Sequence, residues 1–141
     1  MLNARGSAKD EAGLNGYAKQ SYADSRISSI VALEPALGPG FYDFSGMRPM
    51  LSSLIVGFTQ NDFVPFAHHA ARFARALPNS ETYWLRSGEG HFVFLNECTL
   101  AIEANGVPLC EDDQGVSRAQ VHARLSVVIR EFFRDQQAPG R

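Results

Sequence analysis

Residues 51–66 read LSSLIVGFTQNDFVPF, and this stretch decides the fold. Its first eight residues, 51–58, are mostly apolar and include β-branched side chains, which predicts a buried strand. The polar pair Asn61 and Asp62 follows, and beyond Pro65 the apolar residues recur every three to four positions at Phe66, Ala70, Phe73 and Leu77. This spacing predicts a helix over residues 66–77 that Pro78 ends.

The flanking sequence repeats the alternation of short strands and helices. We expect strands at 27–33 and 81–86, a Gly- and Pro-rich loop at 35–50, a short helix within 92–104 and a loop at 105–116. Ser117, with Gln120 three residues later, predicts the start of a last helix, whose apolar stripe is Val121, Leu125, Val128, Ile129 and Phe132. The predicted fold is α/β, with about three parallel strands in a three-layer αβα arrangement.

Length and composition favour one soluble domain. The chain has 141 residues, 45% of them apolar, and a net charge of −2, which gives no reason to expect nucleic acid or an anionic membrane as a partner. We divide it into an arm or partial helix at 1–26, a domain at 27–134 and a tail at 135–141. The polar N-terminus lacks the apolar core of a signal peptide, so the chain as written is expected in the cytoplasm.

Two side chains suited to acid–base chemistry follow neighbouring predicted strands. Asp62 comes after the strand 51–58, and His91 ends the turn Ser87-Gly88-Glu89-Gly90-His91 after the strand 81–86. The carboxyl ends of parallel strands share one edge of a sheet, where binding sites form. A carboxylate that accepts a hydrogen bond from one imidazole nitrogen leaves the other free to take a proton from a nucleophile. We therefore expect Asp62 to orient His91.

These motifs carry a resemblance to a known family. The stretch SSLIVGFTQNDFVPFAHHAARFARALPNSETYWLRSGEGHFVFLNEC, with the preceding DSRISSIVALEPALGPGF and the following CEDDQGVSRAQVHARLSVVIREFF, resembles the C-terminal portion of an α/β-hydrolase of the dienelactone-hydrolase-like group. The resemblance covers roughly residues 24–134. It implies a serine hydrolase that cleaves carboxylic esters or lactones by acyl transfer, with His91 as base and Asp62 as its acid. We expect no cofactor, and we expect no metal because Cys98 and Cys110 do not form a CxxC motif and no His or Cys follows at zinc spacing.

The sequence departs from that family at the nucleophile. No Gly-x-Ser-x-Gly occurs in the 141 residues, although the family carries its serine in this motif between a strand and a helix. We therefore expect little or no hydrolysis by the chain alone. The alternative is a non-catalytic interaction module, or a truncated fragment that pairs with a complementary N-terminal chain or with another copy of itself. Family spacing also makes Asn61, four residues before Pro65, an alternative acid position.

The remaining polar candidates have simpler interpretations. Glu34 follows the first predicted strand and is expected to be a charge at the rim without a role. His68 and His69 are adjacent on a helix and point about 100° apart, so surface and packing roles are expected rather than a metal site. Cys98 and Cys110 either form a disulfide, which would fit an exported or periplasmic parent protein, or remain buried thiols.

Overall fold

The computed structural model describes residues 24–40, 52–61 and 63–137. Most of the predicted arm 1–26 (residues 1–23), most of the predicted loop 35–50 (residues 41–50), residue 51, Asp62 and the end of the predicted tail (138–141) lie outside these residues. The sheet consists of three strands in the order β1-β2-β3, and both pairs are parallel. These strands are β1 (Ser29–Leu33), β2 (Ser52–Phe58) and β3 (Ser80–Leu85).

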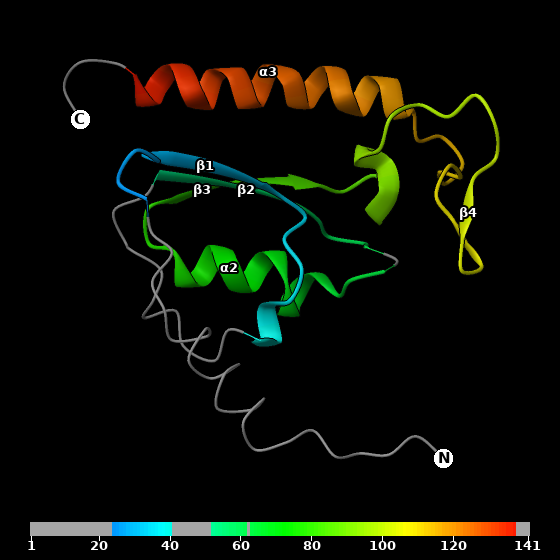
Figure 1. The fold of residues 1–141 in the computed structure, drawn as a ribbon, viewed down its shortest axis with the longest axis horizontal. Helices are drawn as coiled ribbons and strands as arrows, with labels where there is room; N and C mark the ends of the chain where they lie inside the picture. Colours follow the sequence, from blue (N-terminus) through cyan, green and yellow to red (C-terminus); the bar gives the residue numbers. More distant parts are fainter. Residues whose placement is uncertain (1–23, 41–51, 62, 138–141) are drawn as a thin grey trace, which may run out of the picture.

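Helices cover both faces of the sheet. Figure 1 shows α3 (Arg118–Gln136) on one face and α2 (Ala70–Ala76) on the other, with the strands between them. The predicted α/β class with three parallel strands and flanking helices is therefore confirmed. No helix among the described residues is long and apolar enough to cross a membrane.

The central strand β2 explains why the two helices lie on opposite faces. Successive side chains of a strand point to opposite sides, so Leu54, Val56 and Phe58 pack in the core beneath α3, whereas Ile55 packs in the core beneath α2. All four side chains are almost fully buried, and each contributes about 1.5–3 kcal/mol relative to remaining exposed. Such a strand reads as a continuous apolar run because neither face meets water.

Close packing between α2 and the sheet depends on Gly57. A Cβ atom at this position would lie 2.7 Å from the Cβ of Ala70 and 3.0 Å from Cζ3 of Trp84. Both distances are shorter than ordinary carbon contacts, so a larger residue would push the helix away from β2. Because Gly57 precedes the end of β2 by one residue, this contact also fixes the edge from which the next loop leaves.

The last helix begins where the sequence predicts. The Oγ atom of Ser117 accepts a hydrogen bond from the backbone N–H of Gln120, 3.4 Å away, as an N-cap residue does. Val121, Leu125 and Phe132 are buried against the sheet, and Val128 and Ile129 pack beside them. The predicted start and the predicted apolar stripe are both confirmed.

Two predicted helices are wrong in detail. The helix expected over 66–77 is divided into a 3₁₀ turn, Phe66–His68, and the α-helix Ala70–Ala76, because His69 between them has a non-helical backbone, with φ −118° and ψ −100°. The helix expected within 92–104 is only the 3₁₀ helix His91–Phe94.

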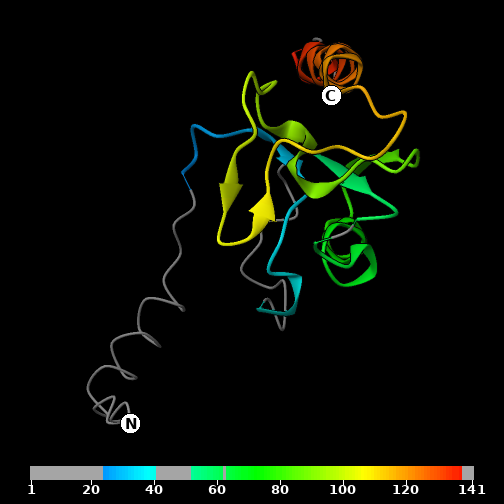
Figure 2. The ribbon, with the colours of Figure 1, turned by 90° about the vertical axis from the view of Figure 1, so that its right-hand side faces the viewer.

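A small hairpin replaces part of the loop expected at 105–116. It joins β4 (Glu103–Ala104) to β5 (Val107–Pro108) in antiparallel fashion, and its strands are visible in Figure 2. Asn105 and Gly106 at its tip both have positive φ, at 52° and 81°. A two-residue hairpin turn of this kind favours Asn-Gly, so the dipeptide carried a local signal for the hairpin.

Candidate functional site

Three polar residues follow the three parallel strands at one edge of the sheet. Glu34 directly follows β1, Asn61 comes three residues after β2, and His91 opens the 3₁₀ helix beyond β3. In Figure 1 the chain leaves all three strands toward the same side. Sites in open parallel sheets form at this edge, because loops from several strands converge there.

Glu34 is buried, which corrects its interpretation as a charge at the rim. It is only 3% exposed, and its backbone φ of 45° lies in the left-handed region that side-chain-bearing residues rarely adopt. Its backbone N–H donates to the carbonyl of Val56, and its Oε2 accepts from the backbone N–H of Phe58 at 2.7 Å. The side chain thus continues the hydrogen bonding to β2 after β1 has ended.

The other carboxylate oxygen of Glu34 is less well satisfied. Oε1 is buried without a hydrogen-bond partner among the described residues. Burial raises the pKa of Glu34 to about 7, against an ordinary value of 4.5, while the Phe58 N–H and the nearby Asn61 side chain partly offset this rise. A buried carboxyl without a countercharge favours its neutral form, so Glu34 changes charge near neutral pH.

Asn61 is held in a defined orientation. Its Oδ1 accepts the backbone N–H groups of Phe63 at 2.7 Å and Val64 at 2.6 Å. Because both donors are N–H groups, the accepting atom must be the amide oxygen, and the other side-chain atom is the NH₂ donor. This arrangement tightens the turn after β2 and leaves the NH₂ group to face other partners.

The NH₂ group of Asn61 faces His91. Its Nδ2 lies 3.4 Å from Nδ1 of the imidazole, a long hydrogen-bond distance. An amide NH₂ can only donate, so in this contact Nδ1 acts as the acceptor. A triad acid would do the reverse and accept a proton from Nδ1. Asn61 therefore meets the imidazole with a donor, which is the opposite hydrogen-bonding character to that of a carboxylate.

Aromatic rings flank His91. Phe63 stacks on the imidazole with centroids 5.3 Å apart and planes inclined by 26°, and Phe92 meets the ring edge-on at 5.1 Å. Phe63 itself is 56% exposed. The imidazole is therefore half-buried beside an apolar surface that remains open to solvent.

The turn before His91 is fixed by a second buried acid, Glu89. This residue is 2% exposed, and its Oε2 accepts from the backbone N–H of Ser87 at 2.6 Å while Oε1 forms an ion pair with Arg124 at 3.2 Å. Gly88, with φ of 79°, supplies the left-handed residue that the turn requires. The turn thereby links β3 to α3 just before the chain reaches His91.

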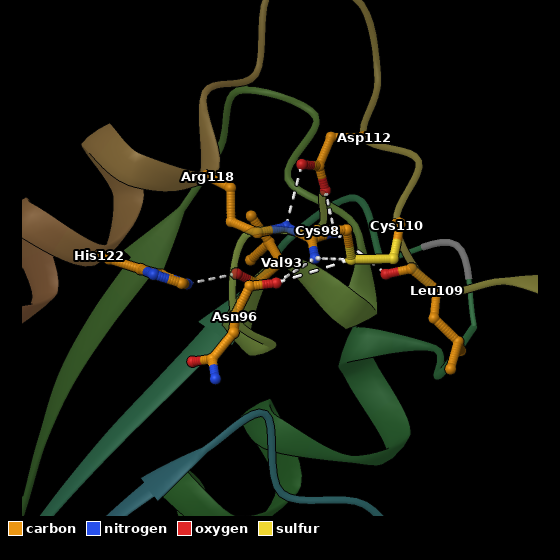
Figure 3. Close-up of polar contacts among 8 residues, drawn as sticks. All are labelled: Val93, Asn96, Cys98, Leu109, Cys110, Asp112, Arg118 and His122. Carbon is orange, nitrogen blue, oxygen red and sulfur yellow. Dashed lines mark hydrogen bonds and ion pairs between the residues drawn. A yellow bond between two sulfur atoms is a disulfide. The ribbon is translucent and has the colours of Figure 1, made fainter. Parts of the chain in front are cut away.

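The segment after His91 is attached to α3 by several polar contacts. His122 donates from Nε2 to the carbonyl of Val93 at 2.7 Å. Figure 3 shows Arg118 at the centre of a second set: its guanidinium binds the carboxylate of Asp112 and the backbone carbonyls of Asn96 and Leu109. Arg118 is 5% exposed in its side chain, and such a buried guanidinium requires partners of this kind.

A disulfide closes the same segment. Cys98 and Cys110 are joined, and their Cα atoms are 5.7 Å apart. Nη1 of Arg118 lies 3.8 Å from Sγ of Cys98, so the disulfide and the guanidinium adjoin each other (Figure 3). Together they fix residues 96–112 relative to α3.

The structure brings some predicted site residues together and not others. His91 meets Asn61, the alternative acid position, whereas Asp62 lies outside the described residues and its predicted role stays a prediction. His68 is exposed, and no cluster of three metal-ligating side chains occurs in the described ranges 24–40, 52–61 and 63–137. Glu34 was missed because a glutamate after a strand usually points to solvent; its position beside the other two strand ends was the available signal.

Comparisons with known proteins add no assignment to this geometry. No family model matches the chain, and neither a curated protein nor a solved structure is detectably similar to it. The fold that can be stated is therefore a small α/β structure with a three-stranded parallel sheet.

Proposed function

We propose that this chain carries the acid–base part of a hydrolase site of the α/β-hydrolase type, which acts on carboxylic esters or lactones by acyl transfer. His91 would serve as general base and then as general acid. The observation that carries the proposal is positional: the loops after β2 and β3 bring residue 61 and His91 to within 3.4 Å of each other at the carboxyl edge of the parallel sheet. The resemblance of residues 24–134 to the dienelactone-hydrolase-like group points in the same direction.

The proposed chemistry requires a proton on Nδ1 and an acceptor at Nε2. In that form Nε2 takes the proton of an attacking hydroxyl and later returns it to the leaving alcohol, while a carboxylate stabilises the imidazolium that forms between these steps. Asp62 is the proposed carboxylate. Asn61 cannot fill this role, because its NH₂ group donates toward Nδ1 and carries no charge to stabilise the imidazolium.

The apolar surface beside His91 suggests the kind of acyl group. Phe63 is exposed and stacks on the imidazole, and Phe92 touches both rings. An acyl chain or aromatic acid could cover Phe63 and exclude water from the imidazole, which strengthens electrostatic interactions at the site. We therefore propose esters of apolar acids rather than of charged ones.

The nucleophile would come from a complementary chain. Among the described residues β1 pairs only with β2, so its other edge offers backbone hydrogen-bonding groups to a further strand. A strand followed by a serine turn and a helix, added beside β1, would place the serine at the same carboxyl edge as His91. This arrangement follows the family order of serine, acid and histidine.

Esterase assays on the purified chain test the proposal. Removing the serine from a complete site costs about 10⁶ in kcat, so we expect only slow hydrolysis of p-nitrophenyl acetate, with water as the nucleophile. That residual rate should fall to the background rate of buffer in His91→Ala. The matched control is His68→Ala, which removes an exposed imidazole and should leave the rate unchanged.

A fluorophosphonate probe should label no serine of the chain. Labelling would show that the chain holds its own nucleophile and would contradict the need for a complementary one. Equal rates for the unaltered chain and His91→Ala would contradict a catalytic role for His91. The non-catalytic alternative, a module that binds a partner strand along β1, would then be favoured.

A further inference from the structure

Glu34 is a buried acid to which the mechanism above gives no role. It is 3% exposed, it occupies a left-handed backbone conformation, and its Oε1 has no hydrogen-bond partner among the described residues. Each of these features is unfavourable by itself: a left-handed backbone costs about 1 kcal/mol, and buried polar atoms are usually bonded. Unfavourable features of this kind gather at functional sites.

Capping β2 does not explain why the residue is an acid. The bond from the Phe58 N–H to Oε2 satisfies the strand end, but a glutamine oxygen would accept the same bond without carrying a buried charge. The ionisable group thus exceeds what the strand end requires. Oε1 is the oxygen that the strand end does not use. Asn61 is the neighbouring side chain that acts on this carboxyl.

Asn61 connects the acid to the histidine. Its oxygen is occupied by the N–H groups of Phe63 and Val64, so its NH₂ group is the part that faces His91, and the Asn61 side chain also favours the charged form of the Glu34 carboxyl, which lowers its pKa. An NH₂ group has two hydrogens and can donate to two acceptors at once. A carboxyl, an amide and an imidazole thus follow the three strand ends, with Oε1 of the carboxyl still without a hydrogen-bond partner among the described residues.

We propose that Glu34 is a positioning residue that sets the protonation state of His91 through the side-chain amide of Asn61. The proposed coupling involves only described residues, and its catalytic meaning rests on the proposed function. Ionised Glu34 attracts the Asn61 NH₂ group and adds negative charge behind the imidazole, which favours the imidazolium. Protonated Glu34 does not attract the NH₂ group and adds no negative charge. The proton affinity of His91 would therefore change as Glu34 titrates.

The surroundings supply no competing charge to Glu34 among the described residues. The groups that act on its carboxyl are the neutral Phe58 N–H and the neutral Asn61 amide. The charged groups that border the turn before His91 are Glu89 and Arg124, and they form an ion pair with each other. Glu89→Gln is therefore a matched control, since it also replaces a buried carboxyl at this edge of the sheet.

NMR titration of the imidazole in the full chain tests the coupling. In the unaltered chain, the His91 ring signals should follow a broadened or two-step curve between pH 5 and 9, as interacting groups do. In Glu34→Gln the curve should become a single step with its midpoint about half a pH unit lower, roughly a threefold change in proton affinity. Glu89→Gln should change the midpoint by less than half of that shift.

A double-variant cycle tests the route through the amide. In an Asn61→Ala background, Glu34→Gln should no longer move the His91 midpoint. An unchanged midpoint in the single variant, or the same shift with and without Asn61, would overturn the proposal. Backbone NMR spectra identify any variant that fails to fold, and Glu34→Asp, which withdraws the carboxylate from Asn61, then serves in its place with the same expected loss of coupling.

The titration does not depend on hydrolysis. If the titrations of Glu34 and His91 are coupled but no esterase rate depends on His91, the role of Glu34 stands and the hydrolase proposal is rejected. The converse result, a His91-dependent rate with no coupling, would reject the role of Glu34 alone.

Discussion

The two buried acids at the carboxyl edge of the sheet are satisfied very differently. Both oxygens of Glu89 are bonded, one to the backbone of Ser87 and the other to Arg124. Glu34 has one bonded oxygen and one without a hydrogen-bond partner among the described residues, and no charged group there acts on it. The two side chains are equally buried, so burial alone does not account for the difference.

The difference extends to the regions around the two acids. Beyond β3, Glu89, Arg118, His122 and the Cys98–Cys110 disulfide fix the chain to α3 through short contacts. In the other region, the contact between Asn61 Nδ2 and His91 Nδ1 is long, at 3.4 Å, and Oε1 of Glu34 has no hydrogen-bond partner among the described residues. The first region stabilises the edge, and the second retains polar groups whose charge can change, which is what acid–base chemistry requires.

The largest effect is expected in the stabilised region. Replacing both cysteines with serine should lower the free energy of unfolding by about 3 kcal/mol, because the disulfide closes a loop of about a dozen residues and restricts the unfolded chain. Urea denaturation of the oxidised chain and the double variant measures this loss. Stability unchanged within about 0.5 kcal/mol would mean that this region is not held by its disulfide, and the contrast with the Glu34 region would weaken.

A smaller effect of opposite sign is expected at Glu34. Its pKa in the folded chain, about 7, exceeds its ordinary value of 4.5, so the folded state retains a proton that the unfolded state has lost. Stability therefore falls as pH rises through this interval and remains lower above pH 7, by about 2–3 kcal/mol at most. Glu34→Gln should remove that part of the pH dependence and be the more stable protein at pH 8.

Denaturation at pH 5 and pH 8 separates the two acids. Glu89→Gln should be less stable than the unaltered chain at pH 8, because Arg124 loses its charged partner. If Glu34→Gln is also less stable at pH 8, the Glu34 carboxyl is well satisfied in its ionised form. The distinction between the two regions would then fail.

The sequence predicts the layers of this fold better than the details of its edge. Continuous apolar runs at β1 and β2 and the stripe from Val121 to Phe132 carry periodic signals that depend only on local residue type. The split of the helix 66–77 at His69 depends on tertiary packing and has no such signal. The hairpin does have a local signal, the Asn105-Gly106 dipeptide, but the prediction of a loop over 105–116 did not use it.

Part of the candidate site can likewise be predicted from the sequence, and part cannot. Strand order places residues 61 and 91 at one edge, so their proximity follows from the alternation of strands and helices. The burial of Glu34 does not follow, because it depends on a side-chain bond to Phe58 of the neighbouring strand. The sequence of residues 34–36 shows only a glutamate between an apolar strand and a proline, as many exposed acids are placed.

The most direct measurement is the His91 titration in Asn61→Asp. The new carboxylate would keep its bonds to the Phe63 and Val64 N–H groups and direct a negative oxygen, in place of the NH₂ group, toward Nδ1. An opposite charge at this distance should raise the midpoint of His91 by about one pH unit. Asn105→Asp, which adds the same charge at the exposed hairpin tip, is the control and should have little effect.

An increase of about one unit in Asn61→Asp, absent in Asn105→Asp, would show that residue 61 occupies the position from which an acid acts on His91. Equal midpoints in the two variants would contradict the account, because position 61 and the imidazole would then not form a coupled pair at the edge of the sheet.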